Sequence, residues 1–497
     1  MRVAVIGAGP KALYAVEALL ARTPDATIDA WDPRPPGTGA AYDLNQPDWL
    51  RLNVTSAIVD GFDAWRRDRG EADPLDPFPP RALLGAYLAE RWASLFARHR
   101  GLTHLPRLAE RVERTPTGWS VDGIDYAEVL LATGHADDSP DALAHGWAGE
   151  ALLVPSVYPI ASLDTVPAGS VVATRGAALT FIDATLALTQ GRGGRFAGDP
   201  TAPTYRASGD EPAAVRPVVR RGRFLAAKPQ PGSAIASAVP AHLRTQGLET
   251  IRAATDAAAA LAVVPATAES LLAELGRSPS RGATVADVFA GAPTHDDPTD
   301  ALRASLLVST DQAPPDAGWA VGAAWRELYP ALVERFSLGG GLDFAPFAEA
   351  APRLEGIAFG PPPVNAAKLL ALIEAGIVDP SSLATDRIDH AGHRGPVPVD
   401  VVVDAVLPAP GVATGEATLP GRLVEAGLIA RAPGRRGVAH TADGTCLSPE
   451  GQPLTGLAVI GRPTEDATIG NDTLSRSLHP ARHAWAGRVA TRIEEEP

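Results

Sequence analysis

The chain of 497 residues contains a single cysteine, Cys446. One cysteine excludes a disulfide within the chain and a redox-active cysteine pair, and it also excludes a cysteine-rich metal site or an iron–sulfur cluster. Because cysteine is not used for disulfides, the cytoplasm is the expected location. Lysine is almost as scarce and occurs only at positions 11, 228 and 368, so arginine supplies nearly all the positive charge.

Acidic residues outnumber basic residues, and the net charge is −14. This balance argues against nucleic acid or an anionic membrane as the main partner. No apolar run approaches the roughly 20 residues of a membrane helix, and a strand expected to begin at Arg2 leaves no room for a signal peptide. Hydrophobic residues make up 45% of the chain and charged residues 21%, which is typical of a soluble globular protein of two or three domains. The abundance of Ala, Gly and Pro is typical of a GC-rich bacterial genome.

Motifs for metal or nucleophilic chemistry are missing as well. The sequence has no HExxH, no GxSxG and no GxxxxGK[ST]. His479 and His483 are four residues apart, but Pro480 lies between them and no acid completes a set of ligands. We therefore expect no metal centre, and the sequence assigns no catalytic side chain.

What is present begins at the N-terminus. Residues 3–6 (VAVI) form a continuous apolar run, which is typical of a parallel strand buried on both faces. The next six residues fit GxGxx(G/A), the turn that binds a dinucleotide pyrophosphate at the start of a helix. They are Gly7, Ala8, Gly9, Pro10, Lys11 and Ala12. A tight strand-to-helix turn without a ligand is the alternative.

An acid follows at the expected distance. Asp32 ends the next predicted strand, 25 residues after Gly7 (32 − 7), close to the roughly 20 expected for the carboxylate that binds ribose hydroxyls. It could instead be a turn residue before Pro33. A second glycine loop with Gly37 and Gly39 comes directly afterwards, and this arrangement is common in FAD enzymes.

Two later segments are predicted to return to the same sheet. The strand of residues 128–135 ends in Thr133 and Gly134, and the strand of residues 457–461 ends in Gly461. Asp472 precedes a helix expected from about residue 473 to 493. We expect Asp472 either to cap that helix or to contact the ribityl chain of a flavin, and both can hold together.

The middle of the chain repeats the pattern imperfectly. A strand at residues 170–175 leads into Gly176, but Ala178 stands where the second glycine belongs. The segment is either a NAD(P)H site or a Rossmann-like domain that has lost its ligand. Arg192 and Arg195 follow the next helix and could clamp a ribose 2′-phosphate, which would favour NADPH, although exposed arginines are the simpler explanation. The cluster at residues 220–223 (RRGR) is either solvated or faces a phosphate.

The remaining segments show no chemistry-bearing spacing. Residues 242–388 are predicted to be mostly helical, with Asn365 as the N-cap of a helix at residues 366–375. They would form an insertion that covers substrate or mediates dimerisation. Residues 389–415 are expected to be a linker, with one further strand at residues 401–406.

The chain resembles a bacterial family of FAD/NAD(P)-binding proteins, which is similar to flavin monooxygenases with two dinucleotide-binding domains, including amine N-hydroxylases. The segments that carry the resemblance are VAVIGAGPKAL, DPRPPGTGAAY, RLNV, FPPRALLGAYL, LLATGH, RGAALTFIDATLALTQGRGGRF, YRASGDEP and VIGRPTEDATIGNDTLSR. The resemblance implies that six positions lie around FAD: Gly7, Gly9, Asp32, Gly39, Asn53 and Asp472. Arg81 matches a motif without an implied contact.

Together these features predict an α/β fold with two Rossmann-like dinucleotide-binding domains and a mostly helical insertion. Residues 1–135 and 416–497 would form a discontinuous FAD domain, and residues 150–241 a NAD(P)-binding-like domain. The expected function is that of an FAD-dependent, NAD(P)H-using monooxygenase of a small molecule. An FAD oxidase or dehydrogenase without a nicotinamide site and a non-catalytic flavin-binding protein are the alternatives.

Overall fold

The computed structural model describes residues 1–495 except 40, 72, 74, 137–140, 277–282 and 413–417. The chain divides into two compact units. Unit 1 comprises Met1–Pro140, Arg335–Gly341 and Pro408–Pro497, and unit 2 comprises Asp141–Glu334 and Leu342–Leu407. Each unit is built around a largely parallel sheet, so the predicted mixed α/β fold is confirmed.

Unit 1 contains a six-stranded sheet in the order β16-β17-β7-β1-β2-β3. Its strands are β1 (Arg2–Ile6), β2 (Thr27–Trp31), β3 (Leu102–Leu105), β7 (Glu128–Leu131), β16 (Thr445–Leu447) and β17 (Pro453–Val459). All neighbours pair in parallel except β16 and β17. The chain proceeds from β1 to β2 and β3 on one side and returns to β7 on the other, so the carboxyl end of β1 is a topological switch point. Ligands of open α/β sheets bind at such points.

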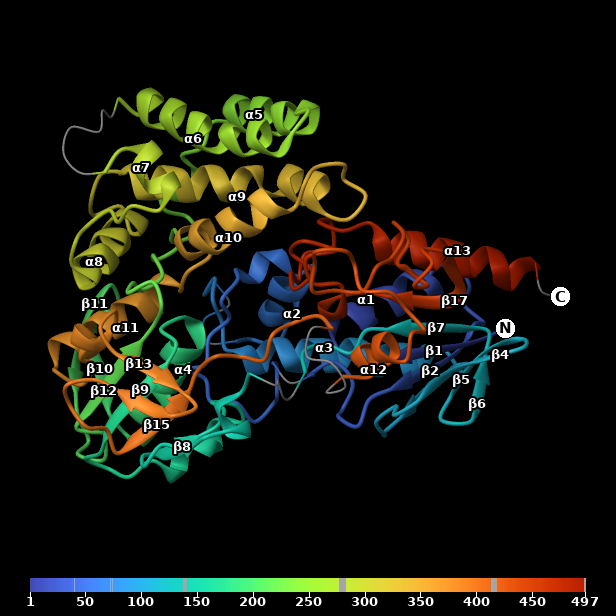
Figure 1. Ribbon diagram of the computed structural model, residues 1–497, viewed down its shortest axis with the longest axis horizontal. Coiled ribbons are helices and arrows are strands. Elements are labelled where there is room, and N and C mark those ends of the chain that lie inside the picture. Colours follow the sequence, from blue (N-terminus) through green and yellow to red (C-terminus); the bar gives the residue numbers. More distant parts are fainter. Residues whose placement is uncertain are drawn as a thin grey trace. The chain divides into compact units, whose positions relative to one another are not determined.

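Both faces of this sheet are covered (Figure 1). On one face, Val3 and Val5 belong to a core that includes residues of α1 (Pro10–Leu20), α3 (Arg81–Arg98) and α13 (Ala481–Glu495). On the other, Ala4 and Ile6 belong to a core with the small antiparallel sheet of β4 (Val112–Thr115), β5 (Gly118–Val121) and β6 (Ile124–Tyr126), and with α12 (Leu419–Glu425). The short helix α2 (Phe62–Asp68) completes the unit. This burial on both sides explains the unbroken apolar run of β1.

A buried carboxylate joins α13 to the sheet. Glu128, at the start of β7, is fully buried and accepts hydrogen bonds from Trp485 Nε1 (3.0 Å), Arg488 Nη2 (2.7 Å) and Arg492 Nη1 (2.7 Å). Two guanidinium groups and an indole thus satisfy one carboxylate, and they hold the C-terminal helix against β7.

Loss of this carboxylate should be costly because Arg492 would lose the carboxylate it pairs with and Trp485 its acceptor, while Arg488 keeps its ion pair with Asp443 at 2.7 Å. We expect Glu128→Ala to lower the free energy of unfolding by about 3 kcal/mol. Urea unfolding followed by circular dichroism measures the change, with the exposed Glu113→Ala on β4 as the control. An equal stability of the two variants would show that the network does not hold α13.

Unit 2 contains a parallel sheet in the order β12-β9-β15-β8. Its strands are β8 (Leu152–Val154), β9 (Val171–Arg175), β12 (Ala214–Val218) and β15 (Val401–Asp404). Helix α4 (Leu179–Leu188) follows β9. Two hairpins lie outside this sheet: β10 (Arg195–Asp199) with β11 (Ala202–Arg206), and β13 (Arg387–Asp389) with β14 (Gly392–Arg394). β15 arises from the segment expected to be a linker, so that segment contributes a central strand to unit 2.

The expected helical segment forms the rest of unit 2. Its helices are α5 (Ala241–Ala253), α6 (Ala257–Glu274), α7 (Val285–Ala290), α8 (Pro298–Ser309), α9 (Ala317–Phe336), α10 (Ala345–Ala358) and α11 (Pro363–Glu374). Within the described residues, α6 is the single helix with the length and mean hydropathy (1.3) of a membrane span, and 44% of it is buried. The bent pair α10 and α11 passes the same test only as one broken span.

Two predicted helix starts are wrong. Helix α13 begins at Ala481 rather than near residue 473, because Pro480 fits the start of a helix but not its interior. Asn365 is not an N-cap, since α11 already begins at Pro363 and Asn365 lies buried within its first turn. A proline marks both boundaries: Pro480 immediately precedes α13, and Pro363 is the first residue of α11.

Candidate functional site

The first βα turn lies at the switch point of unit 1. Gly7 has φ +98°, and its N–H donates to Trp31 O at 2.7 Å. A Cβ on Gly7 would lie 2.3 Å from Ala132 O, so this glycine is required by the fold itself. Ala12 is fully buried in the packing of α1.

Gly9 differs from Gly7 because the fold itself does not require a glycine there. Its φ of −75° is accessible to any residue, and no atom lies within 4 Å of the position that a Cβ would occupy. Gly9 is also the N-cap of α1, where no side chain caps the helix and Pro10 occupies the first turn. Open space in front of a helix N-terminus is a binding site for phosphate, so the turn fits a pyrophosphate.

The predicted ribose acid lies against this turn. Asp32 is 9% exposed, and its carboxylate accepts hydrogen bonds from Ala8 N and Arg34 N, both at 2.9 Å. Gly37 N donates to Ala8 O at 2.8 Å, which brings the second glycine loop to the first. A Cβ on Gly37 would meet the backbone of α3 at 2.6 Å, whereas Gly39 faces open space.

Removal of this carboxylate should weaken the hold on a ribose, and it also takes away the acceptor of Ala8 N in the turn. We expect Asp32→Ala to weaken FAD binding about 10- to 100-fold, the value of one or two hydrogen bonds to a charged group. Fluorescence titration with FAD measures the change, with the exposed Asp25→Ala as the control. Equal affinity of the two variants would remove Asp32 from the site.

The other residues predicted for this site also lie in unit 1. Thr133 and Gly134 follow β7, and a Cβ on Gly134 (φ +77°) would meet no atom within 4 Å. Asn53 lies in the loop after Arg51, whose carbonyl accepts a hydrogen bond from Arg81 Nε at 2.9 Å. Arg81 thus has a structural contact that the sequence did not assign.

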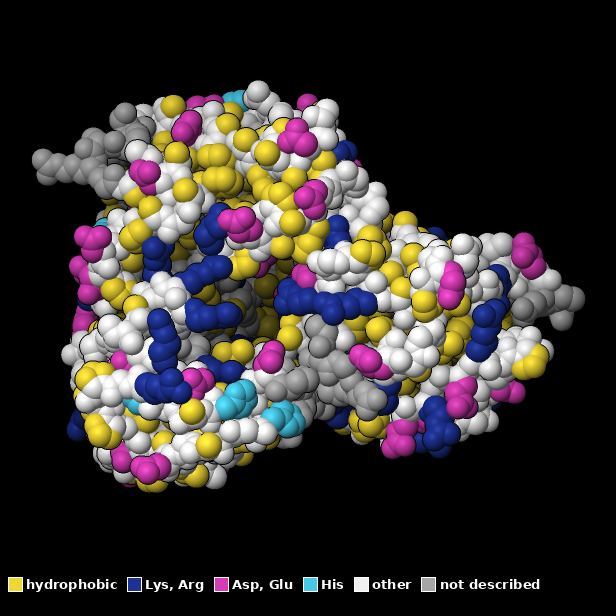
Figure 2. Space-filling view, viewed as in Figure 1, with side chains coloured by type: hydrophobic (Ala, Val, Ile, Leu, Met, Phe, Trp, Pro, Cys, Tyr) yellow, Lys and Arg dark blue, Asp and Glu magenta, His cyan; other side chains and the backbone are white. Residues whose placement is uncertain are grey.

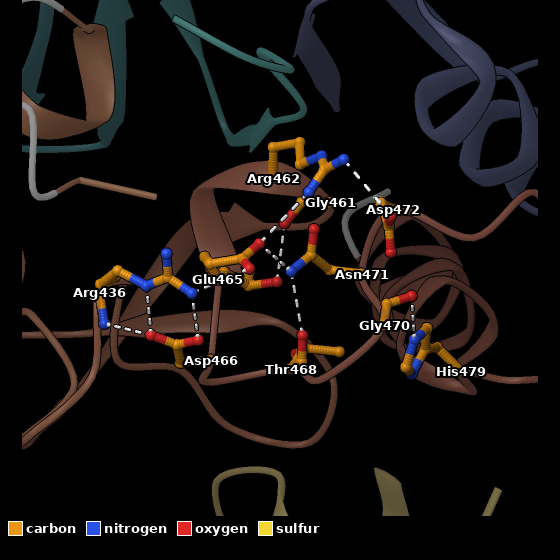
Figure 3. A network of polar contacts seen from close by, with 11 residues as sticks. Arg436, Gly461, Arg462, Glu465, Asp466, Thr468, Gly470, Asn471, Asp472 and His479 are labelled. Atoms are coloured by element: carbon orange, nitrogen blue, oxygen red, sulfur yellow. Dashed lines mark hydrogen bonds and ion pairs between the residues drawn. The ribbon is translucent and has the colours of Figure 1, made fainter. Parts of the chain in front are cut away.

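A polar network organises the loop after β17 (Figure 3). Arg462 forms ion pairs with Asp472 (3.4 Å) and Glu465 (3.6 Å), and Glu465 accepts a hydrogen bond from Asn471 Nδ2 at 2.7 Å. Asp472 therefore caps no helix, because nine positions separate it from Ala481. Its side chain is 55% exposed and pairs with Arg462, a residue that the sequence did not single out.

Lys11 interacts electrostatically with two residues of this network, Asp472 and Arg462. Burial lowers the pKa of Lys11 to about 8, while the negative charge of Asp472 opposes the shift and Arg482 and Arg462 add to it. Burial also lowers the pKa of His135 and of His479 to about 4, so both imidazoles are neutral at pH 7. Sequence reasoning weighed His479 only as a metal ligand with His483, and it did not single out His135, whose charged neighbours Arg462 and Asp472 come from a distant segment.

Unit 2 has a second turn of the same kind. Gly176 has φ +107°, and its N–H donates to Val218 O at 2.8 Å. Ala178 is the exposed N-cap of α4, again without a side-chain cap. Beside it, Arg175 forms a two-pronged ion pair with the buried Asp404, Nε–Oδ1 at 2.8 Å and Nη2–Oδ2 at 2.5 Å. This pair joins the carboxyl ends of β9 and β15.

The two arginines predicted to clamp a 2′-phosphate, Arg192 and Arg195, lie outside the parallel sheet of unit 2. Arg192 donates to the carbonyl oxygens of Leu163 (3.1 Å), Val166 (2.6 Å) and Asp210 (3.0 Å), so its guanidinium holds loops together. Arg195 begins β10, which pairs with β11 and not with β9. The parallel neighbour of β9 is β12.

Comparison with known proteins places the N-terminal region in a class. Residues 4–136 match a family model described as FAD-NAD(P)-binding, and this is the part of the chain that forms the first turn, the Asp32 loop and β7. The expected FAD and NAD(P) cofactors are thus confirmed at the level of this family.

Similar curated proteins carry more specific names. The chain is 28% identical over 253 residues to a nitrosuccinic acid synthase of Aspergillus oryzae, and 25% identical over 272 residues to an L-aspartate N-monooxygenase (nitrosuccinate-forming) of Streptomyces cremeus. The matches span 42% and 43% of this chain but only 38% and 41% of those proteins. A solved structure of an ornithine N-hydroxylase from Kutzneria sp. 744 matches 99% of both chains with 14% identity and a TM-score of 0.49.

Proposed function

We propose that this protein is an FAD-dependent monooxygenase that uses NADPH and oxidises the amine of a small amino acid. The observation that carries the proposal is the first turn of unit 1, where open space at Gly9 and the Asp32 carboxylate lie side by side at a switch point. The names of the two relatives support amine oxidation of an amino acid such as L-aspartate.

The proposal assigns a role to each of the following residues of unit 1. The N–H groups of Gly9, Lys11 and Ala12 bind the pyrophosphate, since those of Gly7 and Ala8 donate to Trp31 O and Asp32. Asp32 accepts hydrogen bonds from ribose hydroxyls, and Gly39 and Gly134 leave room for the nucleotide. Lys11 and Asp472 orient polar groups of the flavin. Bound FAD supplies hydride acceptance and the activation of oxygen. We also propose a cytoplasmic location.

Unit 2 would bind NADPH as the second Rossmann-like domain. Its support is the Gly176 turn before α4 and the arginines that follow β12, the strand next to β9. Arg220, Arg221 and Arg223 come directly after that strand, where NADP-binding folds place the cation that contacts the 2′-phosphate. Figure 2 shows Lys and Arg side chains gathered on the face of unit 2 near α10 and α11.

These arginines lack acidic neighbours. Burial lowers the pKa of Arg221, and the positive charges of Arg353, Arg220 and Arg223 lower it further. Within the described part of the chain, Arg220 and Arg221 make no hydrogen bond or ion pair. A cluster of uncompensated guanidinium groups attracts a phosphate dianion.

A dehydrogenase or oxidase without a nicotinamide site is the second candidate. It is favoured by Ala178, whose methyl group occupies the position of the second glycine in the turn of unit 2. The first domain would then still bind FAD.

Stopped-flow absorbance separates the two candidates. FAD-loaded protein mixed anaerobically with NADPH should lose its visible flavin absorbance, and oxygen with L-aspartate should then yield an N-oxidised product. Bleaching by an organic substrate but not by NADPH or NADH would contradict the monooxygenase and support the second candidate.

A further inference from the structure

Unit 1 contains a pocket whose lining includes none of the residues predicted to bind the dinucleotide. Its volume is 580 Å³, and it lies between residues 57–60 and the segment 475–483 that precedes and begins α13. Its lining residues are Ala57, Ile58, Asp60, Ser475, Arg476, Ser477, His479, Pro480, Arg482 and His483. Two arginines, two histidines and two serines thus face one acid.

One of the two arginines is already neutralised. Arg476 Nη2 lies 2.6 Å from Glu17 Oε2, its Nε lies 3.6 Å from Asp60 Oδ2, and its guanidinium stacks 3.9 Å from the centre of the Tyr14 ring. These contacts fix Arg476 as part of the wall and leave little of its charge for a ligand.

Arg482 is different. Within the described residues its guanidinium contacts no carboxylate: Nη1 lies 3.5 Å from His479 O, and Nη2 lies 3.0 Å from His483 Nε2. Its Nε is buried and makes no hydrogen bond. Desolvation of this kind costs free energy unless an acceptor completes the site.

The groups around Arg482 also favour an anion. His483 accepts the hydrogen bond from Arg482 and is therefore neutral, and its pKa is lowered by burial and by Arg482, Arg22 and Arg476. The hydroxyls of Ser475 and Ser477 form a hydrogen bond with each other at 3.1 Å, which leaves one O–H to donate to a ligand oxygen. Asp60, 69% exposed on the rim, opposes a dianion but can accept from an ammonium group.

We infer that this pocket binds the carboxylate of a small amino acid, with Arg482 as the main donor and Asp60 facing the ammonium group. The pocket adjoins the segment of Asp472, because Nε2 of its residue His479 lies 3.0 Å from Gly470 O, two residues before Asp472. The assignment of this amino acid as the substrate rests on the proposed function, but the binding itself does not.

Titration calorimetry on the full chain loaded with FAD tests the inference with L-aspartate, succinate and inorganic phosphate as probes. We expect the wild-type protein to bind L-aspartate more tightly than succinate and at least tenfold more tightly than phosphate. Arg482→Gln should weaken L-aspartate binding about tenfold or more, the value of a charge-assisted hydrogen bond. Arg111→Gln, at an exposed position of unit 1, should bind as the wild type does.

Arg482→Lys provides a second variant, because it keeps the charge but loses the guanidinium fork, and thermal unfolding checks that each variant is folded. It should bind L-aspartate more weakly than the wild type and more tightly than Arg482→Gln. Wild-type affinity in a folded Arg482→Gln protein, no L-aspartate binding by the wild type, or equal affinity for phosphate would overturn the inference. A protein that binds L-aspartate but is not bleached by NADPH would contradict the proposed function and leave the pocket standing.

Discussion

Gly9→Val should abolish measurable FAD binding and leave the fold intact. The backbone of Gly9 is in a conformation open to any residue, and no atom lies within 4 Å of the added Cβ, so the fold leaves space at this position. The methyl groups of the valine would fill the space proposed for the pyrophosphate. We expect a loss of at least about 100-fold in FAD affinity, or about 2.7 kcal/mol, with a change in stability of less than about 0.5 kcal/mol.

Two further variants show whether this effect belongs to the ligand. Gly7→Ala should destabilise the fold, because Gly7 has φ +98° and its new Cβ would lie 2.3 Å from Ala132 O. Ala21→Val, at the exposed C-terminus of α1, should change neither property. Equal FAD affinity in Gly9→Val and wild type, measured by fluorescence titration, would show that the open space at Gly9 is not the pyrophosphate site.

Replacement of Arg220 and Arg221 together by Gln should remove the preference for NADPH over NADH. The reason is their place after β12, the strand that pairs in parallel with β9, together with their lack of acidic partners among the described residues. Loss of two charge-assisted contacts to a 2′-phosphate should weaken NADPH binding about 100-fold and change NADH binding little.

Binding of 2′,5′-ADP compared with 5′-AMP measures the same preference without turnover. The matched control is Arg195→Gln, which removes the arginine that the sequence favoured but that begins the separate β10–β11 hairpin. If Arg195→Gln lost the preference and the double variant kept it, the 2′-phosphate would lie at the hairpin instead.

The first βα unit could be predicted from the sequence because everything that defines it is local. An apolar run, a glycine spacing and an acid 25 residues later (32 − 7) specify β1, the turn and Asp32. The structure places them in register, with Ile6 opposite Trp31 and the Asp32 carboxylate on Ala8 N. The distant β7 adds to this unit by packing Ala132 against Gly7, but the strand, the turn and the acid could be predicted without it.

The second unit could be predicted only in part because its pairing is not local. The β10–β11 hairpin is inserted between α4 and β12, the strand that pairs with β9. Arg192 and Arg195 therefore precede or begin the hairpin and do not follow the strand next to β9. The fourth strand, β15, comes from a segment more than 220 residues away (401 − 175 = 226). Sequence spacing alone carries no information on such a pairing.

The loop after β17 shows the same limit. The sequence singled out Asp472 as a helix cap or a flavin contact. In the structure it caps no helix and pairs with Arg462, and Asp466 in the same loop pairs with Arg436. The pocket of Arg482 and His483 likewise becomes visible only when α13 and residues 57–60 are brought together.

The central claim is that unit 1 holds FAD across its first βα turn. Titration of the purified full chain with FAD, followed by its visible absorbance after removal of free flavin, tests this claim most directly. We expect one tightly bound FAD per chain in the wild-type protein and none in Gly9→Val. A purified wild-type protein that is colourless and retains no flavin after incubation with an excess of FAD would contradict it.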